Sequence, residues 1–151
     1  MGALSQSETI EQNLASTLES VDQAESLVLE MARRIGFNED DENAISMAVR
    51  ESMVNAVAHG NKYNGRKQVH LVVEGHPGKL VVTVADEGDG FDESTVADPL
   101  AEENLLKQSG RGLLLMRAFM DECTHAKREP RGTVVRMVKL LPAEAQPESI
   151  S

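Results

Sequence analysis

Two runs of β-branched residues, separated by a short turn, constrain the fold of this chain most strongly. The runs are 69–74 and 80–86, and the segment between them, 75–78, contains two glycines and a proline. Val and Thr favour extended backbone because branching at Cβ restricts the side-chain torsion, whereas Gly and Pro favour a reversal. We therefore predict a β-hairpin over residues 69–86, with 75–78 as its loop.

Helices are predicted ahead of this hairpin. In residues 20–35 the apolar side chains recur at three- and four-residue spacing, which is typical of one helix face, and Gly36 follows as a stop. A second helix is predicted to begin near Asn38, where acidic residues complement the helix N-terminus, and to end near 59–60. Segment 8–16 alternates weakly, and we predict an edge strand there.

The chain after the hairpin begins with a long polar segment, 92–109, which is interrupted by Pro99. A connection of this length is typical of a functional lid or of disorder. Residues 113–120 predict a helix, and 124–128 and 133–140 predict a closing hairpin. This order of elements predicts an α+β fold, a two-layer α/β sandwich in which helices cover one face of a mixed, mostly antiparallel sheet.

Length and charge limit the possible functions. The 151 residues suffice for one domain, which we expect to span 8–141 between disordered ends, 1–7 and 142–151. The net charge of −10 repels phosphate backbones, so nucleic acid is excluded as a main partner. The same charge is compatible either with solubility alone or with the docking of a basic protein.

Cysteine content and hydropathy indicate the compartment. A single cysteine, Cys123, excludes an internal disulfide and a cysteine-rich zinc site, and we expect it to be a small buried side chain. No apolar run approaches ~20 residues, and the N-terminus lacks a basic-then-apolar signal pattern. We therefore expect no membrane association and a reduced, cytoplasmic protein.

The predicted second helix carries the first of three polar segments that could form a site. Glu51 and Asn55 are four residues apart, so they share one side of this helix, next to its apolar stripe. A carboxylate and an amide in that position would be partly buried, which is costly unless something occupies them. The alternative is a surface Glu with a capping Asn, and the pair alone does not decide between the two.

The second polar segment, Asp-Glu-Gly-Asp-Gly-Phe at 86–91, ends the second strand of the hairpin. Gly88 and Gly90 allow the backbone to turn sharply and to approach a ligand closely. A carboxylate at the strand end, Asp86, can accept hydrogen bonds from an exocyclic amine. The alternative interpretation is a plain turn.

The third polar segment, 110–112, is Gly-Arg-Gly and precedes the helix predicted at 113–120. Free N–H groups at a helix start favour anions, and Arg111 adds positive charge, although a flexible entry into a helix would look the same. Three such segments in this order, with a lid between the last two, are improbable by chance and predict a phosphate-bearing ligand. A P-loop is excluded because no strand leads into a Gly-rich turn followed by Lys-Ser/Thr.

Together and in this order, the three segments resemble the nucleotide site of the Bergerat ATP-binding (GHKL) fold of histidine kinases, type II topoisomerases, mismatch-repair ATPases and anti-sigma-factor serine kinases. The resemblance covers roughly residues 8–140. The stretches Asn55-Ala-Val-Ala-His59-Gly60 and Gly110-Arg-Gly-Leu-Leu-Leu-Met116 are most similar to the anti-sigma-factor serine kinases. In many histidine kinases the position of Glu51 is Asn instead.

This resemblance implies a role for each matching residue. It makes Glu51 the general base, Asn55 the Mg²⁺ ligand, and Asp86 the acceptor of the adenine amine, shared with water and Thr133. It makes 92–109 the ATP lid. The other residues that it implies for nucleotide binding are His59, Gly88, Gly90, Phe91, Ser109, Gly110, Arg111, Gly112 and Leu113. His59 is expected to pack beside the site, and Gln108 stands where some relatives have a basic residue.

The function implied by the resemblance is an ATP- and Mg²⁺-dependent serine/threonine-protein kinase. It would phosphorylate a small anti-sigma antagonist protein, sequester a sigma factor and form a homodimer. Two alternatives stay open: an ATP-binding adaptor without phosphotransfer, and the detached catalytic domain of a histidine kinase. Glu51 argues against the second alternative, as does the lack of a dimerisation helix with a phosphoacceptor His.

Overall fold

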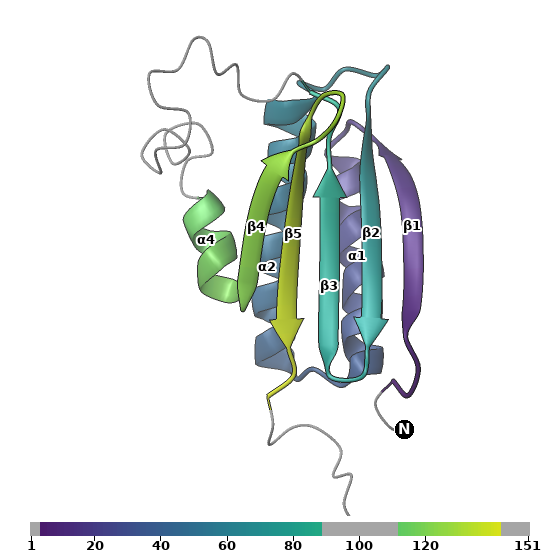
Figure 1. The fold of residues 1–151 in the computed structure, drawn as a ribbon, viewed down its shortest axis with the longest axis vertical. Coiled ribbons are helices and arrows are strands. Elements are labelled where there is room, and N and C mark those ends of the chain that lie inside the picture. The colour runs from purple at the N-terminus through teal and green to yellow at the C-terminus, as the bar shows by residue number, and fades with distance from the viewer. Residues whose placement is uncertain (1–3, 89–111, 143–151) are drawn as a thin grey trace, which may run out of the picture.

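The computed structural model describes residues 4–88 and 112–142, and its ribbon shows two layers, a sheet and the helices behind it (Figure 1). Apart from the π-helix η1, which was not predicted, the predicted and observed elements agree in type and order. In chain order they are β1 (Glu8–Ala15), α1 (Glu19–Ile35), α2 (Glu39–Val54), the π-helix η1 (Asn55–Gly60), β2 (Gln68–His76), β3 (Lys79–Ala85), α4 (Gly112–Phe119), β4 (Glu122–Lys127) and β5 (Thr133–Leu140).

The five described strands form one sheet in the order β1-β2-β3-β5-β4. Helices α1 and α2 lie against one face of it, and α4 lies beside α2 and β4 (Figure 1). The predicted α+β sandwich with helices on one face is confirmed, and so is the edge position of β1. Each pairing of these strands is antiparallel, so the described part of the sheet lacks the parallel component of the predicted mixed sheet.

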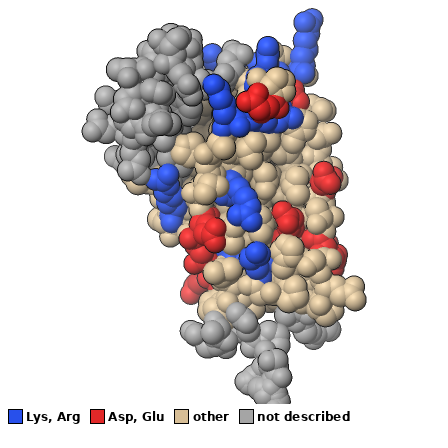
Figure 2. Space-filling model, viewed as in Figure 1, with Lys and Arg blue, Asp and Glu red and all other residues tan. Residues whose placement is uncertain are grey.

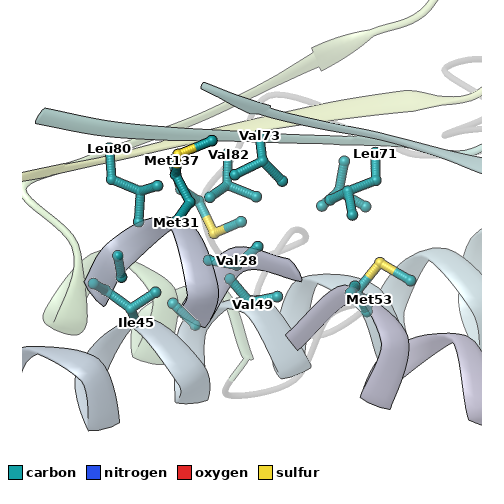
Figure 3. Close-up of a cluster of buried hydrophobic side chains, with 14 of the residues drawn as sticks. Val28, Met31, Ile45, Val49, Met53, Leu71, Val73, Leu80, Val82 and Met137 are labelled. Atoms are coloured by element: carbon teal, nitrogen blue, oxygen red, sulfur yellow. The ribbon is translucent and has the colours of Figure 1, made fainter. Parts of the chain in front are cut away.

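The core between the layers is aliphatic and rich in methionine, as the scarcity of aromatic residues requires. Alternate residues of each central strand point toward the helices, and residues at three- and four-residue spacing on α1 and α2 meet them. The side chains in contact, drawn in Figure 3, include Val28, Met31, Ile45, Val49, Met53, Leu71, Val73, Leu80, Val82 and Met137, all of which are buried. This packing orients β3 and α2, the two elements that carry the candidate site.

The hairpin turn is shorter than predicted. Strand β2 continues through Gly75 and His76, which pair with Leu80 and Lys79, so only residues 77–78 form the turn. The loop prediction at 75–78 is therefore wrong by two residues. A Cβ on Gly75 would lie 2.4 Å from the sulfur of Met31. This glycine allows α1 to approach the sheet and does not serve the reversal.

Helix α2 begins as predicted and ends differently. The Asn38 side chain accepts a hydrogen bond from the backbone N–H of Asp41 at 2.8 Å, which confirms the predicted N-cap. The α-helix stops at Val54, and a π-turn continues it to Gly60. In this turn the N–H of Asn61 donates to the carbonyl of Ala56, five residues earlier, at 2.8 Å. Such π-turns often occur at functional sites.

Two further expectations concern Cys123 and the membrane. Cys123 lies in β4 as a free thiol that is only half-buried, where burial raises its pKa although the charge of Arg117 lowers it in part. Within the described ranges, no helix combines the length and the apolar character that a membrane crossing requires.

Candidate functional site

Asp86, directly after β3, is the most constrained residue of the candidate site. It is 7% exposed, and its Oδ1 accepts hydrogen bonds from the backbone N–H of Gly88 at 2.9 Å and of Thr133 at 3.1 Å. The N–H of Asp86 in turn donates to the carbonyl of Thr133 at 3.0 Å. No described residue donates a hydrogen bond to Oδ2. One carboxylate oxygen is therefore held by β5 and the turn after β3, and the other accepts no hydrogen bond within the described ranges.

At three glycines the backbone packs closely around Asp86. A Cβ on Gly60 would lie 2.4 Å from Asp86 Oδ2, and a Cβ on Gly88 would lie 2.1 Å from the carbonyl oxygen of Gly60. A Cβ on Gly132, which has a φ of +104°, would lie 2.0 Å from the carbonyl oxygen of Asp86. No side chain fits at any of the three positions. Only Gly88 was predicted as a site residue, because the other two are remote from Asp86 in sequence.

The electrostatics of Asp86 follow from this enclosure. Burial raises its pKa, and the two backbone N–H groups and the charges of Arg128 and Lys67 offset only part of that increase. An ionised carboxylate at this depth is stabilised by every further hydrogen bond that it accepts. Oδ2 is therefore suited to accept a hydrogen bond from an amine of a bound molecule.

Glu51 and Asn55 lie on the last turn of α2 and at the start of η1. The N–H of Asn55 donates to the carbonyls of Glu51 and Ser52, so the helix is continuous between the two side chains. Both residues are partly buried, as expected, and neither side chain has a hydrogen bond or ion pair to a described residue. A carboxylate and an amide oxygen are thus available on one side of the helix, and both are suitable for a metal or a hydroxyl group.

The π-turn joins these two parts of the site. It begins at Asn55 and ends at Gly60, whose Cα lies against the carboxylate of Asp86. Ala56 and Val57 take the buried positions of the turn, at 4% and 0% exposure. His59 consequently lies on the outer side and is exposed. The exposure of His59 argues against tight packing, and its place beside the site stays a prediction.

Asn61, directly after the π-turn, is a structural residue of the site that was not predicted from the sequence. It is 1% exposed. Its Nδ2 donates to Ser16 Oγ and to the carbonyl of Gln68, both at 3.0 Å, and its Oδ1 accepts from the N–H of Glu87 at 2.8 Å. These bonds join the ends of β1 and β2 to the segment after Asp86. A polar residue after a helix resembles any turn residue, so no local signal identifies this role.

The structure describes only some of the remaining predicted site residues. Thr133 supplies the N–H on Asp86 Oδ1, and Gly112 and Leu113 form the first turn of α4. The others lie outside the described residues, as does the predicted lid at 92–109. They are Gly90, Phe91, Ser109, Gly110 and Arg111.

Comparisons with known proteins agree with this arrangement. Residues 14–139 match the model of the histidine kinase-like ATPase domain family. A serine-protein kinase RsbW of Staphylococcus aureus is 33% identical over 118 residues, which cover 74% of this chain and 73% of that protein. The RsbW of Staphylococcus epidermidis is 28% identical over 142 residues, which cover 89% and 88% of the two chains.

A similar solved structure is the catalytic domain of the histidine kinase ThkA, with a TM-score of 0.51 and 20% sequence identity. The match covers 88% of this chain and 97% of that domain. At this identity the likeness concerns the fold alone. It is consistent with the two-layer arrangement of sheet and helices described above.

Proposed function

This chain belongs to the histidine kinase-like ATPase family, in its serine-protein kinase branch, and we propose that it phosphorylates a Ser or Thr of a small antagonist protein and sequesters a sigma factor. The relatives named as serine-protein kinases support the reaction. The observation that carries the proposal is the Asp86 carboxylate, held through one oxygen and open through the other, at the end of the π-turn that begins at Asn55.

The described residues fit an adenine nucleotide. Asp86 Oδ2 can accept a hydrogen bond from the exocyclic amine of adenine, and the closely packed backbone at Gly60 and Gly88 leaves no side chain in front of it. An oxygen acceptor paired with that amine selects adenine over bases that carry a carbonyl in the same place. In our proposal Asp86 therefore orients the base, and Thr133 supports it through its backbone N–H.

Asn55 and Glu51 fit the phosphate end. The amide oxygen of Asn55 is the type of ligand that Mg²⁺ prefers, and Asn55 has no side-chain partner among the described residues. Glu51, one helical turn earlier, would take the proton of the incoming Ser or Thr hydroxyl. Bound Mg-ATP supplies the phosphoryl group that is transferred. The half-buried position of Glu51 lets a protein substrate reach it while partly excluding water.

Further parts of the proposal rest on sequence pattern. We assign phosphate contacts to 109–113 and the lid to 92–109, because Gly-rich backbone ahead of a helix favours anions. The proposal includes adenine contacts by Gly90 and Phe91, and a homodimer located in the cytoplasm, where sigma factors act. It keeps His59 as a residue that lies beside the bound nucleotide.

The test is a transfer assay with the full chain, radiolabelled ATP, Mg²⁺ and the antagonist candidate encoded beside its gene. The expected product is acid-stable phosphoserine or phosphothreonine on the antagonist. A sigma factor is also expected to co-purify with the chain. Acid-labile phosphohistidine would replace the proposal by a detached histidine kinase domain. ATP binding without any transfer would replace it by an adaptor that uses ATP as a switch.

A further inference from the structure

One end of the sheet carries a basic groove that the proposed function does not use. It has a volume of about 450 Å³ and lies between the turn before β2 and the turn from β4 to β5, at the top of Figure 1. We define the basic groove by its lining residues, Asn64, Arg66, Lys67, Glu87, Arg128, Pro130 and Arg131. Figure 2 shows basic side chains gathered at this end of the molecule, with acidic atoms among them.

The charge of the basic groove contrasts with that of the whole chain. Four of its seven lining residues are cationic, Lys62 belongs to the turn before β2, and Lys127 is the last residue of β4. This end of the sheet therefore holds six of the fifteen Lys and Arg residues in a chain of net charge −10. A negative group is repelled by the net charge of the chain and attracted to this end. Such a contrast directs an acidic partner to one place.

The backbone under the basic groove is held by hydrogen bonds. The side chain of Asn64 accepts from the N–H of Arg66 at 2.8 Å, and the carbonyl of Lys67 accepts from Ser16 Oγ at 2.6 Å. In the opposite turn the N–H of Arg128 donates to the carbonyl of Gly132 at 2.9 Å. These hydrogen bonds fix the backbone of both turns, so the binding of a partner would order only side chains.

Glu87 makes the lining mixed in sign. Its Oε1 accepts from the N–H of Gln68 at 3.1 Å, and its Oε2 lies 2.6 Å from His70 Nε2. Burial raises the pKa of Glu87, but these hydrogen bonds and the charge of Arg128 lower it by a larger amount. The pKa of Glu87 therefore lies below its ordinary value. An ionised Glu87 repels a dense polyanion and accepts hydrogen bonds from N–H groups. A peptide presents both carboxylates and N–H groups to such a surface.

We propose that the basic groove binds an acidic segment of a protein partner, with the arginine side chains holding its carboxylates. A planar guanidinium matches a carboxylate through two parallel hydrogen bonds, and Arg66, Arg128 and Arg131 face one groove. Nucleic acid fits less well, because its backbone would run on over the acidic remainder of the chain, which has few aromatic residues for stacking.

The position of the basic groove relates it to the candidate site. Arg128 Nη1 lies 3.5 Å from the backbone carbonyl oxygen of Asp86, so a residue that lines the groove contacts the residue that carries the enclosed carboxylate. A partner that docks in the groove therefore lies next to the nucleotide end of the sheet. The inference goes beyond the proposed function, because the docking itself requires neither ATP nor phosphotransfer.

The test is a titration of a fluorescein-labelled peptide of alternating Glu and Ser with the full chain, followed by fluorescence anisotropy at low salt without nucleotide. We expect saturable binding that weakens as salt is added. Arg66→Glu and, separately, Arg131→Glu should each weaken binding about 10-fold. Lys79→Glu, at the opposite end of the sheet, makes the same change in net charge and should leave the affinity within about twofold.

Three results would overturn the docking proposal. They are the absence of saturable binding, equal weakening by Lys79→Glu, and tighter binding of a single-stranded oligonucleotide of matched charge. Arg66 and Arg131 are exposed, so circular dichroism of the variants should be unchanged. Because the titration contains no ATP, its failure leaves the kinase assay untouched, and a chain without kinase activity can still bind the peptide.

Discussion

The two ends of the candidate site are built in different ways. At one end Asp86 is 7% exposed, held by two backbone N–H groups and enclosed by glycines from three segments. At the other end Glu51 and Asn55 project from a helix, partly exposed and without side-chain partners among the described residues. The Asp86 end is formed by backbone packing, whereas the Glu51 end consists of side chains added to a helix that is already stable.

This difference follows from what each end is proposed to bind. A flat base needs one acceptor at an invariant position, which packed backbone supplies. Phosphates, a metal and an incoming hydroxyl need charged and polar side chains that stay unpaired until the ligands arrive. We therefore expect changes at Glu51 to affect chemistry alone, and changes around Asp86 to affect both binding and folding.

The largest effect is expected at the Glu51 end. Glu51→Ala removes the proposed base and should lower the rate of phosphotransfer about 10³-fold, because proton removal from the hydroxyl is then left to water. ATP affinity by calorimetry and the melting temperature should stay close to those of the wild type. Glu39→Ala, an exposed position at the start of the same helix, is the control and should transfer phosphate normally. An unchanged rate for Glu51→Ala would remove the base assignment.

A smaller effect is expected when the acceptor at the other end is changed. In Asp86→Asn, the amide oxygen can still accept the N–H groups of Gly88 and Thr133, so the fold should persist. The amide NH₂ would then face the adenine amine, and two donors would meet without an acceptor. ATP binding should weaken roughly 100-fold in calorimetry. Wild-type affinity in this variant would show that adenine lies elsewhere.

The glycines test whether the Asp86 end belongs to the fold itself. Gly132→Ala places a methyl group 2.0 Å from the carbonyl oxygen of Asp86 at a φ of +104°, and should cost about 2 kcal/mol in urea unfolding. Gly65→Ala is the control, because a Cβ there meets nothing within 4 Å, and its effect should stay within about 0.5 kcal/mol. Equal stability of the two variants would refute the close packing at Gly132.

The sequence allowed the elements and their order to be predicted, because each rests on local patterns. The β-branched runs of β2 and β3, the three-four spacing in α1 and the Asn38 cap are each encoded within a few neighbouring residues. Asp86 could be predicted as a candidate site residue for the same reason, since the glycines that follow it mark a turn at a strand end.

Contacts between remote segments could not be predicted in this way. Gly60 and Gly132 contact Asp86 from 26 and 46 residues away, and Asn61 joins three segments through one buried amide. Gly75 was assigned to a turn because a strand glycine opposite a helix has the same local appearance as a turn glycine. The π-turn after Val54 has no pattern of its own, since its residues continue the apolar spacing of α2.

The smallest predicted effect separates the binding role of Asp86 from its effect on stability. Because burial raises its pKa in the folded state above that in the unfolded chain, ionised Asp86 destabilises the fold at neutral pH, and the native state takes up a proton as the pH falls. The stability that this group contributes is present below its unfolded pKa and is lost as the pH rises through its folded pKa.

Asp86→Asn should thus be at least as stable as the wild type at neutral pH. This advantage in the free energy of unfolding should shrink as the pH falls into the range in which carboxyl groups ordinarily titrate. Urea unfolding of both proteins at each pH measures the difference in their free energies of unfolding. The contributions of all other titrating groups cancel in this difference. A difference that stays constant with pH would mean that Asp86 is not held in the enclosed, partly desolvated state that distinguishes this end of the site from Glu51.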